Sequence, residues 1–185
     1  TIISVNTASI LTNKNYKELL IGADLRNPQI HKYLDMDKSQ EGLSNYIYSK
    51  GENFEKYIHK NGELDIILSG TIPPNPTQLL ASERFKKLIN KVKHQYDYVI
   101  IDSAPCLLVS DTFEISKYVD STIYVMRSNF SSKELCSFVG ECKLSNKLNN
   151  INIVLNAVGN SSSYGYKYGY QYGYNYAYNY GYGYG

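Results

Sequence analysis

The sequence predicts an α/β fold, with a doubly wound, mostly parallel sheet and flanking helices. Two observations between residues 1 and 158 predict it. Short apolar runs alternate with stretches of helical pattern, and the runs are continuously apolar, as in parallel strands that are covered on both faces. Right-handed crossovers join such strands, and ligands of such sheets bind at the carboxyl ends of the strands.

Five strands and three helix starts are predicted in order along the chain. The strands are the apolar runs 17–24, 64–70, 96–102, 121–127 and 151–158. Asparagine followed by proline fits an N-cap and the first helical position, and two further pairs have capping-box spacing. These starts are Asn75 before Pro76, which opens a helix over 76–96, Asp111 with Glu114, and Ser131 with Glu134.

Composition limits the class of protein. The 185 residues, 43% of them hydrophobic, suffice for one packed domain and a tail, and a net charge of +2 gives little reason to expect nucleic-acid binding. No apolar run approaches the roughly 20 residues that span a bilayer, and no signal peptide is recognisable, so the chain is expected to be soluble and cytosolic. The three cysteines are expected to be reduced thiols, and the three scattered histidines suggest no metal site.

The composition changes abruptly after Gly159, which predicts a domain over 1–159 and a tail over 160–185. From residue 164 to 184 every even position is a tyrosine, and most of the residues between are glycine or asparagine. Alternating tyrosines could lie on one face of a self-associating strand. Glycine entropy and the lack of aliphatic residues favour disorder in the isolated chain.

Two acidic strand ends are candidates for chemistry. Asp102 ends the apolar run of YDYVIIDSAP, which is a Walker B pattern, and its carboxylate could hold a hydrated Mg²⁺ beside nucleotide phosphates. Asp24 and Arg26 in LLIGADLRNP are predicted at the same edge of the sheet. Asp24 could share the metal, while Arg26 pairs with a phosphate or an acidic neighbour. A structural strand-end carboxylate and a capping salt bridge are the alternatives.

Four segments in order carry a resemblance to a known family: GADLRNP, SGTIPPNPTQLL, YDYVIIDSAP, and VLNAV followed by the tyrosine cluster. Together they resemble the bacterial tyrosine kinases of exopolysaccharide synthesis, within the wider group of MinD- and ParA-like P-loop ATPases. The resemblance implies ATP and Mg²⁺ as cofactors. It also implies catalytic roles for Asp24, Asp102 and Arg26.

The resemblance assigns Thr1 to the last position of a phosphate-binding loop that ends Gly-Lys-Thr or Gly-Lys-Ser, where it would contact nucleotide and metal. The strand, glycines and lysine of that motif would lie upstream of Thr1. We therefore expect a fragment or truncated product that binds nucleotide poorly by itself. Gly22 replaces the first aspartate of the family's Asp-x-Asp, so Asp24 or Asp102 must orient the phenol, or no base is needed.

In the family the tyrosine cluster is the phosphoacceptor, which explains a segment of so many phenols. The implied acceptors are Tyr164, Tyr166, Tyr168, Tyr170, Tyr172, Tyr174, Tyr176, Tyr178, Tyr180, Tyr182 and Tyr184. Each tail would enter the site of the next protomer in a ring-like homo-oligomer, and phosphorylation would loosen the ring. Asn156 occupies the place of an adenine contact, or else makes a strand-end hydrogen bond to backbone.

The resemblance further implies a membrane chain-length regulator as partner, a tyrosine phosphatase, and a place on the cytoplasmic side of the bacterial inner membrane. Two other interpretations remain open. One is a MinD- or ParA-like ATPase, which needs no tyrosine tail. The other is a catalytically inactive scaffold with a self-associating tail, which Gly22 and the absent loop favour.

Overall fold

The computed structural model describes residues 1–158 except residues 13, 15 and 52, and the α/β fold is confirmed. The chain divides into two compact units, residues 1–112 and residues 113–185, and each is described by itself. The predicted boundary near residue 159 falls at the end of the described residues. The predicted tail, with all eleven candidate acceptor tyrosines, lies outside them.

The first unit contains a four-stranded sheet in the order β2-β3-β1-β4. Its central strand β1 (Glu18–Gly22) is fully buried and pairs in parallel with β3 (Leu64–Ile67) and β4 (Tyr98–Asp102). The apolar runs predicted these three strands correctly. Strand β2 (His59–Asn61) pairs antiparallel with β3 and was not predicted, because its three residues are polar.

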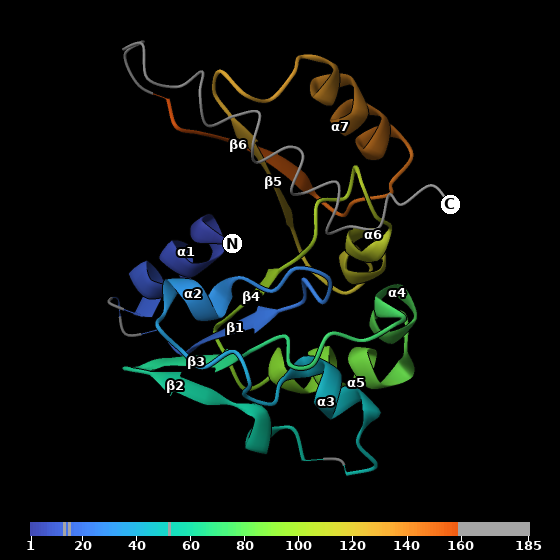
Figure 1. Ribbon diagram of the computed structural model, residues 1–185. Helices are drawn as coiled ribbons and strands as arrows, with labels where there is room; N and C mark the ends of the chain where they lie inside the picture. The colour runs from blue at the N-terminus through green and yellow to red at the C-terminus, as the bar shows by residue number, and fades with distance from the viewer. Residues whose placement is uncertain (13, 15, 52, 159–185) are drawn as a thin grey trace. The chain divides into compact units, whose positions relative to one another are not determined.

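Helices cover both faces of this sheet, with α1 and α2 on one side and α3 and α5 on the other (Figure 1). One core cluster joins Val5 and Ala8 of α1 and Ile30 of α2 to Leu20 and Ile66 of the sheet. The helical elements of the unit are α1 (Ile2–Thr12), α2 (Ile30–Tyr33), α3 (Leu43–Tyr48), η1 (Glu55–Tyr57), α4 (Pro76–Leu80), α5 (Glu83–Val92) and the start of α6 (Asp111–Ser116).

The prediction of one helix over 76–96 was wrong, because α4 ends at Leu80 and α5 begins at Glu83. Ser82 is the N-cap of α5, and its hydroxyl accepts a hydrogen bond from the backbone N–H of Phe85 at 3.3 Å. Serine is among the strongest N-cap residues, so Ser82 starts a new helix where the apolar pattern alone predicted continuity.

The second unit contains the parallel strands β5 (Thr122–Arg127) and β6 (Ile151–Asn156), in a sheet of their own, and helix α7 (Glu134–Leu144). The predicted helix start at Ser131 was wrong, because the N-cap is Lys133 and Ser131 instead accepts a hydrogen bond from the Arg127 N–H at 2.9 Å. Across the described parts of both units, no helix is long and apolar enough to cross a membrane.

Candidate functional site

The two acidic strand ends lie at the same edge of the first unit's sheet. Gly22 of β1 is in register with Asp102 of β4, and the Ala23 N–H donates to the Asp102 carbonyl at 2.7 Å. Asp24 follows two residues after Gly22. Both carboxylates are nearly buried, with 6% exposure for Asp24 and 4% for Asp102. The parallel pairing of neighbouring strands therefore gathers the predicted acidic residues at one carboxyl edge.

Asp102 is held by hydroxyl groups at the start of α1. The Thr1 hydroxyl donates to Asp102 Oδ2 at 2.8 Å, and the Ser4 hydroxyl donates to Oδ1 at 2.8 Å. Thr1 thus stands next to the strand-end carboxylate, while its assigned contact with nucleotide and metal stays a prediction. Sequence reasoning missed Ser4, although its spacing of three residues from Thr1 puts both on the first turn of the helix.

Asp24 shapes the turn that follows β1. Its Oδ1 accepts hydrogen bonds from the backbone N–H groups of Arg26, at 3.2 Å, and of Asn27, at 2.9 Å. These bonds fix a tight turn after the strand. The Asp24 side chain therefore has a local structural function in addition to any role with a ligand.

Arg26 pairs with an acidic neighbour, which is one of the two partners that the sequence allowed. Its Nε and Nη2 donate to the two carboxylate oxygens of Asp111 at 2.8 and 3.1 Å, and Nη2 also donates to the Thr77 hydroxyl at 3.1 Å. Thr77 in turn donates to Asp111 at 2.5 Å. Asp111 begins α6, as predicted, and is fully buried. This cluster links the segments that follow β1, β3 and β4.

The space beside Gly22 is filled by Ser69. A Cβ at position 22 would lie 2.7 Å from Ser69 Oγ, 3.0 Å from Ser69 N and 3.2 Å from Ile30 Cδ1. Sequence reasoning treated Gly22 as a lost carboxylate and could not foresee that a serine occupies the vacated space. Any larger residue at position 22 would require Ser69 and the backbone after β3 to move.

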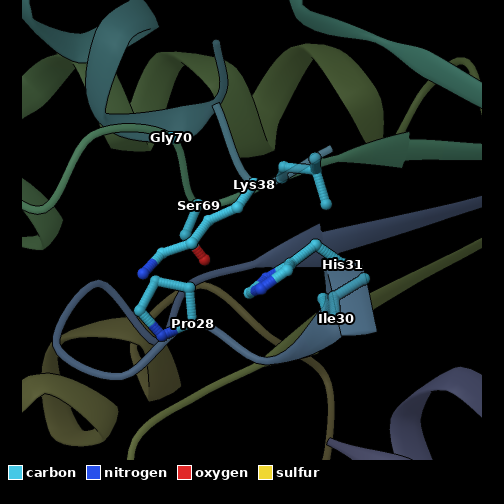
Figure 2. Close-up of a pocket in the computed structure, with 7 residues that line it drawn as sticks. Pro28, Ile30, His31, Lys38, Ser69 and Gly70 are labelled. Atoms are coloured by element: carbon cyan, nitrogen blue, oxygen red, sulfur yellow. The ribbon is translucent and has the colours of Figure 1, made fainter. Parts of the chain in front are cut away.

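Ser69 also lines a small cavity that Figure 2 shows between the segment after β1 and the end of β3. His31 and Lys38 bring basic groups to it, and Pro28 closes one side. Burial lowers the pKa of His31, and the nearby charges of Lys32 and Lys38 lower it further. The cavity volume of about 10 Å³ admits no more than one water molecule.

The donor set around Asp102 fits Mg²⁺. A threonine hydroxyl and carboxylates are hard oxygen ligands, which Mg²⁺ prefers, and this ion usually takes one or two carboxylates together with substrate phosphates. The described residues contain no group of three or more histidine, cysteine or acidic side chains that could hold a metal. Thr1, Asp24 and Asp102 would therefore hold Mg²⁺ only together with nucleotide.

Asn156, the predicted adenine contact, ends β6 in the second unit. Its Oδ1 accepts a hydrogen bond from the Ala157 N–H at 2.8 Å, and its carbonyl accepts one from the Ser128 N–H at 2.9 Å. The first of these is the strand-end bond to backbone that the sequence left as the alternative. An adenine contact by Asn156 stays a prediction.

Comparison with known proteins gives a family match and several relatives. The AAA domain family matches residues 1–155. The tyrosine-protein kinase ptk of Acinetobacter johnsonii is 36% identical over 128 residues, which are 68% of this chain and 17% of that protein. The tyrosine-protein kinase YwqD of Bacillus subtilis is 32% identical over 155 residues, which are 83% of this chain and 65% of that protein. The chain thus spans less than two thirds of either relative.

Solved structures show the same likeness. The VpsO kinase domain is 31% identical with a TM-score of 0.76, covering 84% of this chain and 77% of its own. The kinase domain of the Escherichia coli tyrosine kinase ETK is 30% identical with a TM-score of 0.74, covering 89% of this chain and 66% of its own. MinD of Aquifex aeolicus, in complex with MinC, is 19% identical with a TM-score of 0.66, covers 84% of this chain and 62% of its own, and shares the fold alone.

Proposed function

The chain belongs to the AAA domain family and, within it, to the bacterial tyrosine kinases, and from this premise we propose that it is the catalytic part of a tyrosine autokinase. It transfers the γ-phosphoryl group of ATP to tyrosines of the segment 164–184. The observation that carries the proposal is the juxtaposition of Thr1, Asp102 and Asp24 at one sheet edge in a chain that also supplies eleven alternating tyrosines.

The residues at the sheet edge have separate parts in the reaction. Mg²⁺ bound with ATP would neutralise the negative charge of the phosphates, and Thr1 and Asp102 would hold the metal. Asp24 would accept a hydrogen bond from the incoming phenol and so orient it. The phenol oxygen bonds to the γ-phosphorus as the bond to ADP breaks, and the phenol proton passes to Asp24 or to solvent. Because the transition state is loose, alignment contributes more than a strong base.

Transfer between copies follows from the properties of the segment. Glycine neighbours would not obstruct a phenol, and an unfolded chain of about 25 residues would have a root-mean-square reach of roughly 25–30 Å. Each phosphotyrosine adds about −1.5 to −2 charges, so a few of them make a chain of net charge +2 anionic. Phosphorylated segments would be repelled by Asp24 and Asp102. We therefore propose a ring-like homo-oligomer that phosphorylation dissociates and a tyrosine phosphatase restores.

The biological setting follows from the same family. We propose that the protein regulates polymerisation and export of an exopolysaccharide, together with a membrane chain-length regulator on the cytoplasmic side of the inner membrane. The greater length of the ptk kinase, of which this chain spans 17%, supports a partner domain or protein. An inactive scaffold is the second candidate, and Gly22 with Ser69 in its space favours it.

A mixing experiment tests transfer in trans. The protein expressed from its complete gene is prepared in two variants, one with Asp102→Asn and an intact tyrosine segment, the other with all eleven tyrosines of the segment replaced by phenylalanine. The mixture is incubated with radiolabelled ATP and Mg²⁺, and the two chains are separated by size with a fusion tag. Label on the Asp102→Asn chain supports the proposal. No label in the mixture, with label absent from the wild-type protein as well, would refute the kinase and favour the scaffold.

A further inference from the structure

We propose that a groove on the first unit binds tyrosine side chains from the segment 164–184 of a second copy. This docking groove lies between α3, η1 and the loop 71–74, and its volume is about 520 Å³. That size falls within the ~300–1,000 Å³ of typical binding sites. The inference rests on the proposed function, because it names where the substrate segment binds before and during transfer.

The surfaces of the docking groove suit a phenol ring. Tyr57 is buried and packs edge-on against Tyr46, with ring centres 5.8 Å apart. Pro73 is buried, whereas Pro74 and Ile72 are exposed, Ile72 to 52%, and these two residues give the groove its apolar surface. An aromatic ring that enters would cover apolar surface that now faces water.

The wall of the docking groove is fixed in advance. Ser44 donates to the Thr71 carbonyl at 2.6 Å, Asn45 accepts from the Thr71 N–H at 3.2 Å, and the Tyr48 hydroxyl donates to Asn75 at 2.6 Å. These bonds tie the loop to α3 on either side of its two prolines. A preformed wall lowers the entropy that is lost when a peptide segment binds.

Two charged side chains allow the docking groove to form hydrogen bonds with a phenol hydroxyl. Glu41 and Lys56 both line it. The Lys56 ammonium lies 4.5 Å from the centre of the Tyr57 ring, so it stands over the aromatic surface. A phenol can donate to the Glu41 carboxylate or accept from the ammonium, whereas a phenylalanine ring can do neither.

The docking groove and the acidic strand ends belong to the same edge of one sheet. The loop 71–74 follows the carboxyl end of β3, which is the parallel neighbour of β1. The Leu43 and Ser44 N–H groups donate to the Leu68 and Ser69 carbonyls at 2.7 and 3.1 Å, so α3 is bonded to that strand end. A segment in the groove is thus held along the edge that carries Asp24 and Asp102.

The tyrosine segment has the periodicity that such a groove can use. Alternate residues of an extended chain are about 6.6–6.8 Å apart, so one anchored phenol places others at regular steps along the edge. Any of the eleven tyrosines can serve as anchor while another reacts, which raises the local concentration of acceptors. We infer that the groove recognises a tyrosine by its position in the alternating repeat and requires no sequence motif around it.

The test is a binding titration without ATP. A fluorescent peptide with the sequence of residues 164–185 is titrated with the 185-residue chain, in which the eleven tyrosines of the chain's own segment are replaced by serine so that it does not compete. This reference chain is compared with the same chain carrying Ile72→Ser or Glu41→Gln, and anisotropy gives Kd. The matched control is Ile10→Ser, since Ile10 on α1 is similarly exposed at 58% and lies outside the groove. Circular dichroism confirms that each variant is folded. We expect Ile72→Ser to weaken binding at least about fivefold and Ile10→Ser to leave it unchanged.

Peptide variants separate the contribution of the aromatic ring to binding from that of the hydroxyl group. Replacing every tyrosine of the peptide by phenylalanine is expected to weaken binding, and replacing every tyrosine by serine is expected to abolish it. The proposal is overturned if the reference chain does not bind the peptide, or if its Ile72→Ser and Glu41→Gln variants both bind the peptide as tightly as it does.

The failure of this inference is distinguishable from failure of the proposed function. Binding that depends on Ile72 in a protein that never labels its tyrosines would leave the docking groove intact and refute the kinase. Normal labelling of the segment, with an unchanged KM for the peptide in the Ile72→Ser variant, would refute the docking groove and leave the kinase intact.

Discussion

Replacing Asp111 by alanine tests the buried cluster that links three segments at the catalytic edge. The carboxylate is fully buried and accepts hydrogen bonds from Arg26 Nε, Arg26 Nη2 and the Thr77 hydroxyl. Removing one partner of a buried ion pair costs about 3–5 kcal/mol, because the other charge is left uncompensated. The Arg26 side chain is 24% exposed, so water can reach the guanidinium. We therefore expect a loss near the lower limit, about 3 kcal/mol.

Urea unfolding of the 185-residue chain, followed by circular dichroism at 222 nm, measures this loss. The control is Glu83→Ala, which removes an ion pair with Lys86 in which the Glu83 side chain is 78% exposed. That substitution should cost at most about 1 kcal/mol. The double variant Arg26→Ala with Asp111→Ala should lose less than the sum of the single variants, because no unpaired charge remains. The reasoning is refuted if Asp111→Ala costs no more than Glu83→Ala, or if the two single losses add.

Three further predictions concern other parts of the first unit. Gly22→Ala should lower stability by about 1–3 kcal/mol because its Cβ would approach Ser69 Oγ to 2.7 Å, and an unchanged melting temperature would contradict this. Burial and the Asp65 carboxylate raise the pKa of Tyr96 above the ordinary value of a tyrosine, about 10, so stability should fall as the pH rises above about 10, where the unfolded chain ionises first. Melting curves from pH 9 to 11 should show a shallower fall for Tyr96→Phe, and equal slopes would count against it. Ser82→Ala should cost about 1 kcal/mol in urea unfolding, while Ser82→Thr should cost less, since only alanine removes the cap of α5.

Local sequence pattern predicted the strands and the acidic edge because both depend on short stretches of chain. The apolar run before Asp102 and the one before Asp24 are each readable within eight residues. Once both are parallel strands of one sheet, their carboxyl ends must meet at one edge. The family resemblance assigned Thr1 to the end of a phosphate-binding loop, and the structure puts its hydroxyl 2.8 Å from Asp102 Oδ2.

The partners of these residues could not be read from the sequence because they are distant along the chain. Asp111 is 85 residues from Arg26, and only the fold brings them together. The space beside Gly22 is filled by Ser69, from the segment that follows β3. The sequence alone therefore indicated only that a carboxylate is lost at Gly22. The structure shows that Gly22 packs closely against Ser69.

The break between α4 and α5 was missed for a different reason. Apolar residues recur at helical spacing on both sides of Ser82, so periodicity alone favours one helix. The Ser82 hydroxyl instead begins a second helix, because it caps α5 by accepting a hydrogen bond from the Phe85 N–H. The hydrogen bond from a backbone N–H to the serine hydroxyl three residues before it begins a second helix, although the apolar pattern continues. A serine inside an apolar helical stretch can therefore mark the start of a new helix.

The most direct test of the account is to map phosphotyrosine on the protein expressed from its complete gene after incubation with ATP and Mg²⁺. Mass spectrometry should find phosphate on tyrosines between residues 164 and 184, and the Asp102→Asn variant should carry none. Wild-type protein without phosphate in that segment, or an Asp102→Asn variant phosphorylated as fully as wild type, would contradict the central claim that this sheet edge transfers phosphate to its own tyrosine segment.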